Sequence, residues 1–282
     1  MTTFLKRSIT IIACCLVVTT GLAQGSYPLL EWSPEYNARS AKFDRLLQSS
    51  EQGFFTYRPA ATSIISGARD EYFAYYNRYD LSEQWLLKNP RWEWNGRRVD
   101  FKESLMLGGV QYLFYESYDR QSDTRNLLVR TLDTLANLSE PKLIETLDSK
   151  RRSQGDFTIK ASQDRSKFAV FTNPPYERFG SENFYVRVYS ADLAEDWNAD
   201  IELNVRDRNF NIIDFDLSNS GDVFILSVFD NSPNVMLQSG KDLDYKLMRI
   251  GAGDNNQITE FDLGLRNVAV HSLGIECDLK DN

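Results

Sequence analysis

The feature of this sequence that most constrains its fold is an internal repeat. Short apolar stretches lie on either side of a tight turn, and the residues just before successive turns are Leu47, Leu107, Ala161, Leu217 and Leu273. The steps between these positions are 60, 54, 56 and 56. The stretches are rich in Val, Ile, Phe and Tyr, which suit a pleated, half-buried surface. The repeat therefore predicts an all-β chain.

Each unit contains room for four strands. In the third unit we expect strands at about 156–161, 167–172, 183–190 and 197–203. Four antiparallel strands per unit of about 50 residues are typical of a β-propeller blade. A β-sandwich also has short strands at regular spacing, but tandem sandwiches would not restart at so short and even a step. We predict a β-propeller-like array of four-stranded antiparallel blades.

The last unit is incomplete, because "RNVAVHSLGIECDLKDN" supplies one strand and a turn and then stops. Either a strand at 266–273 closes a four-bladed ring onto the first blade, or the chain is truncated or forms an open arc. We favour truncation or an open arc, because most propellers of this kind have more blades. The predicted blades span about 42–97, 98–150, 151–206 and 207–263, with a partial unit at 264–282.

One six-residue motif, Asp-Leu-(Ser/Ala)-Glu-x-Trp, occurs twice. Asp80 and Trp85 recur 112 positions later as Asp192 and Trp197, in the turn between the third and fourth strands. An Asp that opens a turn accepts hydrogen bonds from backbone N–H groups two or three residues further on. We therefore expect the Asp to fix the turn and the Trp to cover an apolar edge, with sugar stacking by Trp as the alternative.

Two turns carry a family resemblance. "SQDRSKFAVF" (162–171) and "SNSGDVFILSV" (218–228) resemble the turn of TolB-type and WD-repeat-like propellers, and "LGGVQYLFYESYDRQSDTRNLLVRTLD" (107–133) is similar to secreted bacterial propeller proteins of unassigned activity. The resemblance covers about 42–282 and implies a fold, not an activity. The Trp-Asp pair of WD repeats is missing, and so is the TolB-type Gly in the first three turns.

The N-terminus has the pattern of a secretory signal peptide, residues 1–23. Lys6 and Arg7 precede an uncharged, mostly apolar run, and "GLA" ends at Ala23. A membrane anchor is the alternative, but the run is shorter than the roughly 18–20 residues that a span needs. Lipidation at Cys14 is a second alternative. We expect an exported chain, periplasmic, cell-surface or extracellular, with a leader or strap at 24–41.

Composition limits the partners of the mature chain. Cleavage would leave Cys277 alone, so no internal disulfide forms, and apolar residues at 42% must supply a large core. Removal of Lys6 and Arg7 takes the net charge from −8 to −10. A net acidic chain lacks the basic footprint of nucleic-acid binding, so no nucleic acid is expected. We also expect no transmembrane segment in the mature chain.

Few residues indicate chemistry. His271 is the single histidine, and one Cys six residues away does not complete a metal site, so we expect neither metal nor cofactor. Asp214 and Asp216 at i, i+2 on a strand would face the same way and either bind a cation, share a proton or lie in water at a strand edge. No phosphate loop or nucleophile elbow is present.

The loops divide into two faces with different charge. Loops joining strands 1–2 and 3–4 of each blade carry eleven acidic residues and one base, Arg165. The inter-blade connectors "NGRRVDFK", "DSKRRSQGD" and "NVRDRN" lie on the other face, near the axis. Guanidinium groups pair with carboxylate or phosphate bidentately. The candidate ligand-binding residues are Arg97, Arg98, Arg151, Arg152, Arg206 and Arg208, and the alternative is that both faces are simply solvated.

We therefore expect a non-enzymatic binding or scaffold module for an anionic glycan or a protein partner. A carbohydrate-active propeller enzyme is an alternative that needs two carboxylates at catalytic separation. The expected acids lie mostly on the opposite face, which argues against it. A structural N-terminal part of a longer envelope protein is the third possibility.

Overall fold

The structure, a computed structural model, describes residues 45–59, 71–149, 155–177, 179–231, 242–251, 253, 257–265, 270 and 272–280. The predicted signal peptide and leader, together with Arg151, Arg152 and His271, lie outside these residues. Among the described residues, no helix has the length and apolar character that a membrane crossing requires.

Four antiparallel sheets follow one another along the chain. The first contains β1 (Arg45–Ser49), β2 (Gly53–Pro59), β3 (Glu71–Asn77) and β4 (Glu83–Lys88). The second contains β5 (Glu93–Trp94), β6 (Arg97–Leu107), β7 (Val110–Asp119), β8 (Thr124–Leu132) and β9 (Lys142–Asp148). The third contains β10 (Asp156–Ala161), β11 (Lys167–Asn173), β12 (Ser181–Ser190) and β13 (Glu195–Arg206). A single 3-10 turn, η1 (Asp207–Asn209), leads to the fourth, with β14 (Phe210–Leu217), β15 (Val223–Asp230), β16 (Leu243–Ile250) and β17 (Ile258–Asp262).

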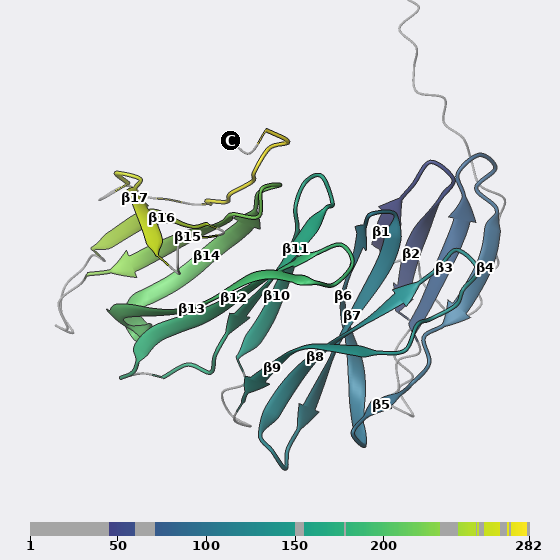
Figure 1. Ribbon diagram of the computed structural model, residues 1–282, viewed down its shortest axis with the longest axis horizontal. Helices are drawn as coiled ribbons and strands as arrows, with labels where there is room; N and C mark the ends of the chain where they lie inside the picture. Colours follow the sequence, from purple (N-terminus) through teal and green to yellow (C-terminus); the bar gives the residue numbers. More distant parts are fainter. Residues whose placement is uncertain are drawn as a thin grey trace, which may run out of the picture.

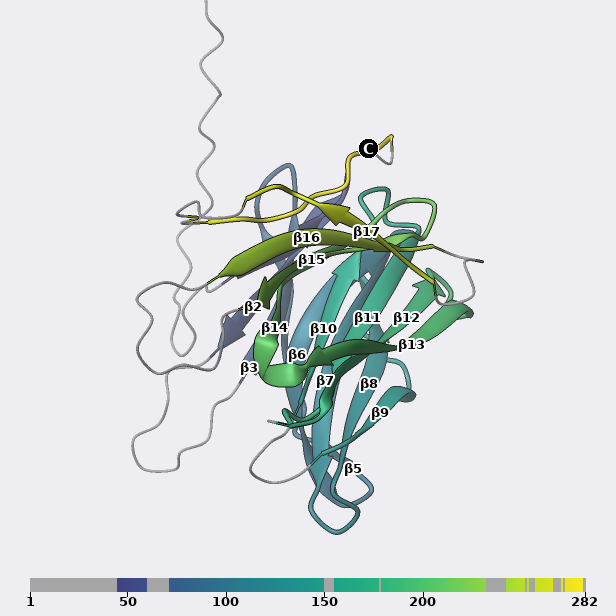
Figure 2. The same ribbon diagram turned by 90° about the vertical axis from the view of Figure 1, so that its left-hand side faces the viewer.

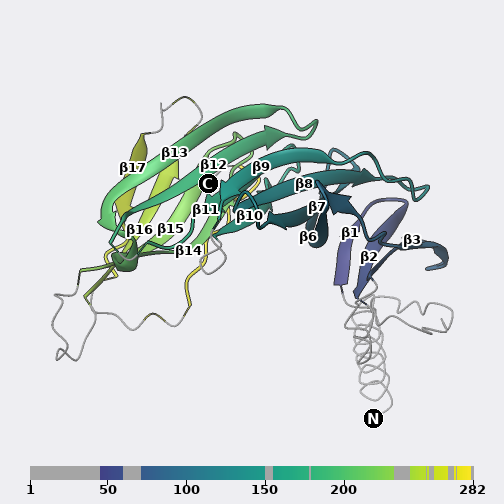
Figure 3. The same cartoon turned by 90° about the horizontal axis from the view of Figure 1, so that it is seen from below.

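The sheets form a curved row, with the first and fourth at opposite ends (Figures 1 and 3). Figure 2 shows the strands of the fourth sheet crossing those of the second steeply, as successive twisted blades do. The strand β6 contacts β1 on one side and β10 on the other, and β10 contacts β14. These four strands form the inner side of the row. The prediction of an all-β, propeller-like array in an open arc is confirmed.

The apolar core lies between neighbouring sheets, and the run Tyr112–Tyr115 of β7 shows why. Tyr112 and Phe114 pack into the cluster shared with the third sheet, whereas Leu113 and Tyr115 pack into the cluster shared with the first. Successive strand side chains point to opposite faces. A strand that is buried on both faces is therefore apolar throughout instead of alternating.

Ion pairs connect the inner strands of successive sheets. Arg45 of β1 lies 3.5 Å from Glu103 of β6. The Nζ atom of Lys102 on β6 lies 2.8 Å from Asp156 of β10. Lys160 of β10 repeats the pattern with Asp214 of β14, at 2.7 Å. Each junction of the row therefore carries one basic residue from the earlier sheet and one acidic residue from the later sheet.

The repeated hexapeptide has the structural role that the sequence predicts. The Oδ1 atom of Asp80 accepts the N–H of Ser82 at 3.0 Å, and Oδ1 of Asp192 accepts that of Ala194 at 3.2 Å. The Leu after each Asp has a positive φ, 55° and 67°. A β-bulge then precedes the Trp in both copies.

Both tryptophans connect neighbouring sheets. The Nε1–H of Trp85 donates to the carbonyl oxygen of Thr134 at 2.8 Å, in the second sheet. The Nε1–H of Trp197 donates to that of Gly221 at 3.0 Å, in the fourth sheet. Each ring also packs against an apolar cluster. The hexapeptide thus forms a turn, and its Trp connects this turn to the next sheet.

The second sheet departs from the expected pattern. The stretch 95–102 is not a connector, because β5 pairs with β6 and places Arg97 and Arg98 within a strand. The two-residue loop is Asn95-Gly96, with φ of 51° and 72°. Asn-Gly is the preferred pair for a hairpin whose two central residues both need positive φ. This signal was visible in the sequence.

The C-terminal segment 272–280 lies beside β14 and has no strand assignment. The N–H of Ile275 donates to Asp214 at 3.3 Å, and that of Cys277 donates to Asp216 at 2.6 Å. Both carboxylates lie on the edge strand β14, as the sequence predicts, and they also hold the backbone of this segment, a partner that the sequence does not indicate. Lys160 and the N–H of Phe215 are further partners of Asp214.

Candidate functional site

Two cavities open on the face where the loops between second and third strands meet the connectors. The η1 cavity, about 440 Å³, lies between the third and fourth sheets. The acidic cavity, about 720 Å³, lies between the second and third sheets. Pro174 lines both of them, so the segment 174–177 is the wall that separates them.

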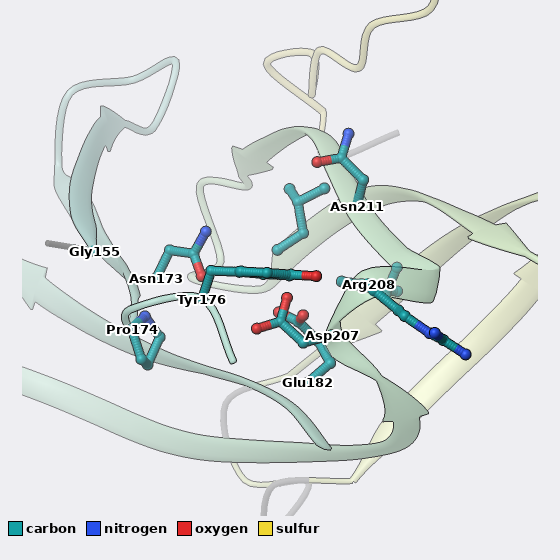
Figure 4. A pocket seen from close by; sticks show the side chains of 10 residues that line it. Gly155, Asn173, Pro174, Tyr176, Glu182, Asp207, Arg208 and Asn211 are labelled. Carbon is teal, nitrogen blue, oxygen red and sulfur yellow. The ribbon is translucent and has the colours of Figure 1, made fainter. Parts of the chain in front are cut away.

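The η1 cavity contains a pair of carboxyl groups. Glu182, at the start of β12, is 6% exposed, and its carboxyl group is hydrogen-bonded to that of Asp207 in η1. Figure 4 shows these two groups side by side beneath the ring of Tyr176. Burial, followed by the charge and hydrogen bond of Asp207, raises the pKa of Glu182 to about 8. At neutral pH the pair therefore shares one proton.

Backbone contacts hold Asp207 in place. Its Oδ2 atom accepts the N–H of Glu177 at 2.6 Å, and its own N–H donates to the carbonyl oxygen of Gly180 at 3.2 Å. Ser181 is paired in register with Arg206, which brings the two chain segments together at this end of the sheet. The connector η1 is thus fastened to Glu177 and Gly180 of the third sheet.

The acidic cavity is lined by Asp123, Asp148 and Glu177, and no described residue that lines it is basic. The phenol of Tyr118 donates to Oδ1 of Asp123 at 2.9 Å. Tyr185 also lines the cavity, and burial, followed by nearby Asp200 and Asp148, raises the pKa of its phenol. The described part of this cavity therefore favours a cation over an anion.

The four predicted arginines that the structure describes do not converge on one site. Arg97 pairs with Asp119 at 2.9 Å, and Arg98 pairs with Asp100 at 3.1 Å, and neither lines the η1 cavity or the acidic cavity. Arg208 lines the η1 cavity, and its Nε–H donates to Asn209 at 3.1 Å. Arg206 is exposed nearby, at the end of β13. Arg151 and Arg152 stay predictions, since they lie outside the described residues.

The sequence reasoning missed the carboxyl pair. Asp207 stands between two of the predicted arginines, in "RDR", and was counted only as charge. Glu182, in "GSENFY", is 25 positions away and carries no local signal. Only the register of β12 with β13 brings them together. Among the described residues, no group of three or more His, Cys, Asp or Glu side chains is placed to hold a metal ion.

No protein-family model matches this chain, and no curated protein matches it. Solved structures do match. One is the β-propeller domain of the trilobed protease from Pyrococcus furiosus, with 10% identity and a TM-score of 0.42, covering 79% of this chain and 57% of that one. Another is the acylaminoacyl peptidase of Pyrococcus horikoshii, with 13% identity and a TM-score of 0.43, covering 84% of this chain and 34% of that one. The chain thus spans between a third and three fifths of the length of these two proteins.

Proposed function

We propose that this chain is an exported, non-enzymatic binding module that takes a polypeptide partner on the face of the two cavities. The observation that carries this proposal is the pair of adjoining polar cavities on either side of the segment 174–177. Clefts between repeated units are common places for ligands. Two cavities in a row suit an extended segment that places successive side chains into each of them.

The charges of the described residues favour a basic polypeptide over the anionic glycan that the sequence suggested. Five carboxyl groups line the two cavities together, against the single guanidinium group of Arg208. Arg97 and Arg98 are already paired with acids. Complementary charge gives specificity and speeds association. A Lys or Arg side chain of the partner would fit the acidic cavity.

The carboxyl pair gives less support to the carbohydrate-active alternative. Retaining glycosidases hold their two carboxyl groups about 5–5.5 Å apart, and inverting enzymes hold them further apart to admit water. Glu182 and Asp207 are in direct hydrogen-bond contact. This spacing leaves no room for a glycosidic bond between them. The TolB-type classification and the role as part of a longer envelope protein stay predictions.

A binding assay with short peptides tests the proposal. Fluorescence anisotropy would compare a labelled Lys/Arg-rich peptide, an acidic peptide and a polyuronate oligosaccharide with the purified mature chain at low and physiological salt. We expect the basic peptide to bind, and Asp148→Asn to weaken it about threefold to tenfold because one rim charge is lost. The matched control is Glu140→Gln, an exposed acid on the opposite face.

Two outcomes would contradict the proposal. One is tight binding of the polyuronate that is lost in Arg208→Ala, which would restore the anionic ligand. The other is equal weakening of the basic peptide by Asp148→Asn and Glu140→Gln, which would mean that binding is non-specific attraction to an acidic chain.

A further inference from the structure

The contact between Glu182 and Asp207 stands at the covalent connection between the third and fourth sheets. That connection is the short turn η1, and its first residue is Asp207 itself. Three links fasten it to the third sheet: the N–H of Glu177 on Oδ2 of Asp207, the N–H of Asp207 on Gly180, and the carboxyl–carboxyl hydrogen bond. The last link exists only while one of the two groups is protonated.

We propose that Glu182 and Asp207 form a pH-sensitive clamp, which holds η1 against Glu177 and Gly180 of the third sheet while a proton bridges the two carboxyl groups and releases it when that proton is lost. Two carboxylates in contact repel each other, because like charges at this distance disfavour joint ionisation. Glu182 is 6% exposed, so water solvates a negative charge on its carboxyl group poorly while the side chain stays in this position.

In the described part of the chain, the charged groups around the pair do not replace the proton. From η1, the guanidinium group of Arg208 is bonded to Asn209 and extends away from the pair (Figure 4). From β13, Arg206 is exposed. Tyr176 and Glu177, which precede β12, supply a phenol and a further carboxyl group, and neither is a cation. Arg178 lies outside the described residues. Among the described residues, neither Glu182 nor Asp207 has an ion-pair partner.

The cavity gives the clamp room to open. The η1 cavity, about 440 Å³, adjoins the pair directly, so the two carboxylates can separate without displacing the apolar core. The segment 174–177 is also a wall of the acidic cavity. Release of the clamp therefore changes the shape of both cavities at once, whatever ligand they take.

The direction of the pH effect follows from linkage. The closed state binds the Glu182 proton more tightly than an open, hydrated state, in which the pKa returns to its ordinary value near 4.5. The opening equilibrium therefore rises with pH between about 4.5 and about 8 and levels off above that. From pH 6 to pH 9 the opening constant increases by up to about a hundredfold.

Hydrogen–deuterium exchange of the purified mature chain at pH 6 and pH 9, corrected for the intrinsic exchange rate, tests the clamp. We expect protection in peptides covering 174–182 and 205–210 to fall at least tenfold, while a peptide covering β8 stays unchanged. Glu182→Gln should keep its protection at both pH values, because the amide donates to Asp207 without a titratable proton. Asp207→Asn should also be insensitive to pH.

Three results would overturn the proposal. The first is equal protection of the wild type at both pH values. The second is the same loss of protection in Glu182→Gln as in the wild type. The third is a loss that includes β8, since this would be general destabilisation and not local release of η1.

Discussion

Single Asp side chains stabilise several turns of this molecule by accepting backbone hydrogen bonds. Asp80, Asp133 and Asp192 each accept a backbone N–H two residues further on. Side-chain hydrogen bonds from Ser82, Asn137 and Ser190, respectively, together with these backbone bonds, lower the pKa of the three groups. The acidic face predicted from sequence is therefore, at these positions, a set of turn-forming acceptors.

The first prediction concerns the acid stability of one such turn. A depressed carboxyl pKa contributes stability above the ordinary value of about 3.8, and this contribution is lost as the pH falls through the folded-state pKa. Asp192→Asn keeps the acceptor oxygen but cannot titrate, so its melting temperature should fall less steeply than that of the wild type below pH 4. Thermal unfolding followed by circular dichroism at pH 2.5 to 6 measures this slope, and identical slopes would contradict the prediction.

A second prediction at the residue scale concerns Gly53. A methyl group at this position would overlap the carbonyl oxygen of Tyr76 and the ring of Tyr75. Gly53→Ala should therefore lower the free energy of unfolding by about 2–3 kcal/mol, the upper part of the range for overpacking, because a backbone atom is the nearest neighbour. Gly109→Ala is the control, because that residue has a φ of 82° but no neighbour within 4 Å, and it should cost about 1 kcal/mol. Urea denaturation measures the free energy of unfolding of both variants. An equal decrease in the two variants would refute the prediction.

At the scale of strands and turns, the connections between sheets depend on a few side chains. Trp85 and Trp197 each leave the edge of one sheet and donate to a turn of the next. The bulge before each Trp directs its ring across the junction. The hexapeptide therefore recurs because the same junction recurs two sheets later.

The third prediction tests this connection. Trp197→Phe keeps an aromatic ring against the apolar cluster but removes the Nε1–H donor to Gly221. The free energy of unfolding should fall by about 1–2 kcal/mol, the usual cost of leaving a carbonyl without its partner plus some lost packing. Trp85→Phe should behave similarly. Chemical denaturation followed by far-ultraviolet circular dichroism provides the measurement, and two variants as stable as the wild type would show the bonds to be incidental.

The C-terminal segment permits a fourth prediction at this scale. Cys277 is 5% exposed, and its N–H is bonded to Asp216. Asp216→Ala should release the segment and increase the rate at which a disulfide reagent modifies Cys277 by about tenfold or more. Asp216→Asn, which keeps an acceptor, should react at nearly the wild-type rate, and Asp100→Ala is the exposed control. An unchanged rate in Asp216→Ala would mean that other contacts bury the thiol.

At the scale of the whole molecule, the curved row of sheets could be predicted because the sequence signals for its strands and turns are local and recur in every unit. Strands such as β7 and β12 have apolar runs and turn residues that can be read directly, and the repeat supplies their order. The hairpin of β5 and β6 was missed although Asn95-Gly96 signals it. The pairing of Glu182 with Asp207 was not predictable, because it depends on how β12 and η1 meet. Asp214 and Asp216 were expected on one face, but their partner, a segment much later in the chain, had no sequence signal.

Within the described residues, the inner strands contact one another in succession, β1 with β6, β6 with β10, and β10 with β14. In such a row, an end sheet has one neighbour and an interior sheet has two, so cooperativity is weakest at the ends. If the chain is pulled from its two ends in an optical trap, the outer sheets should therefore yield before the inner ones. The extension trace should show separate steps, each releasing the length of a single sheet, in place of one rupture of the whole molecule.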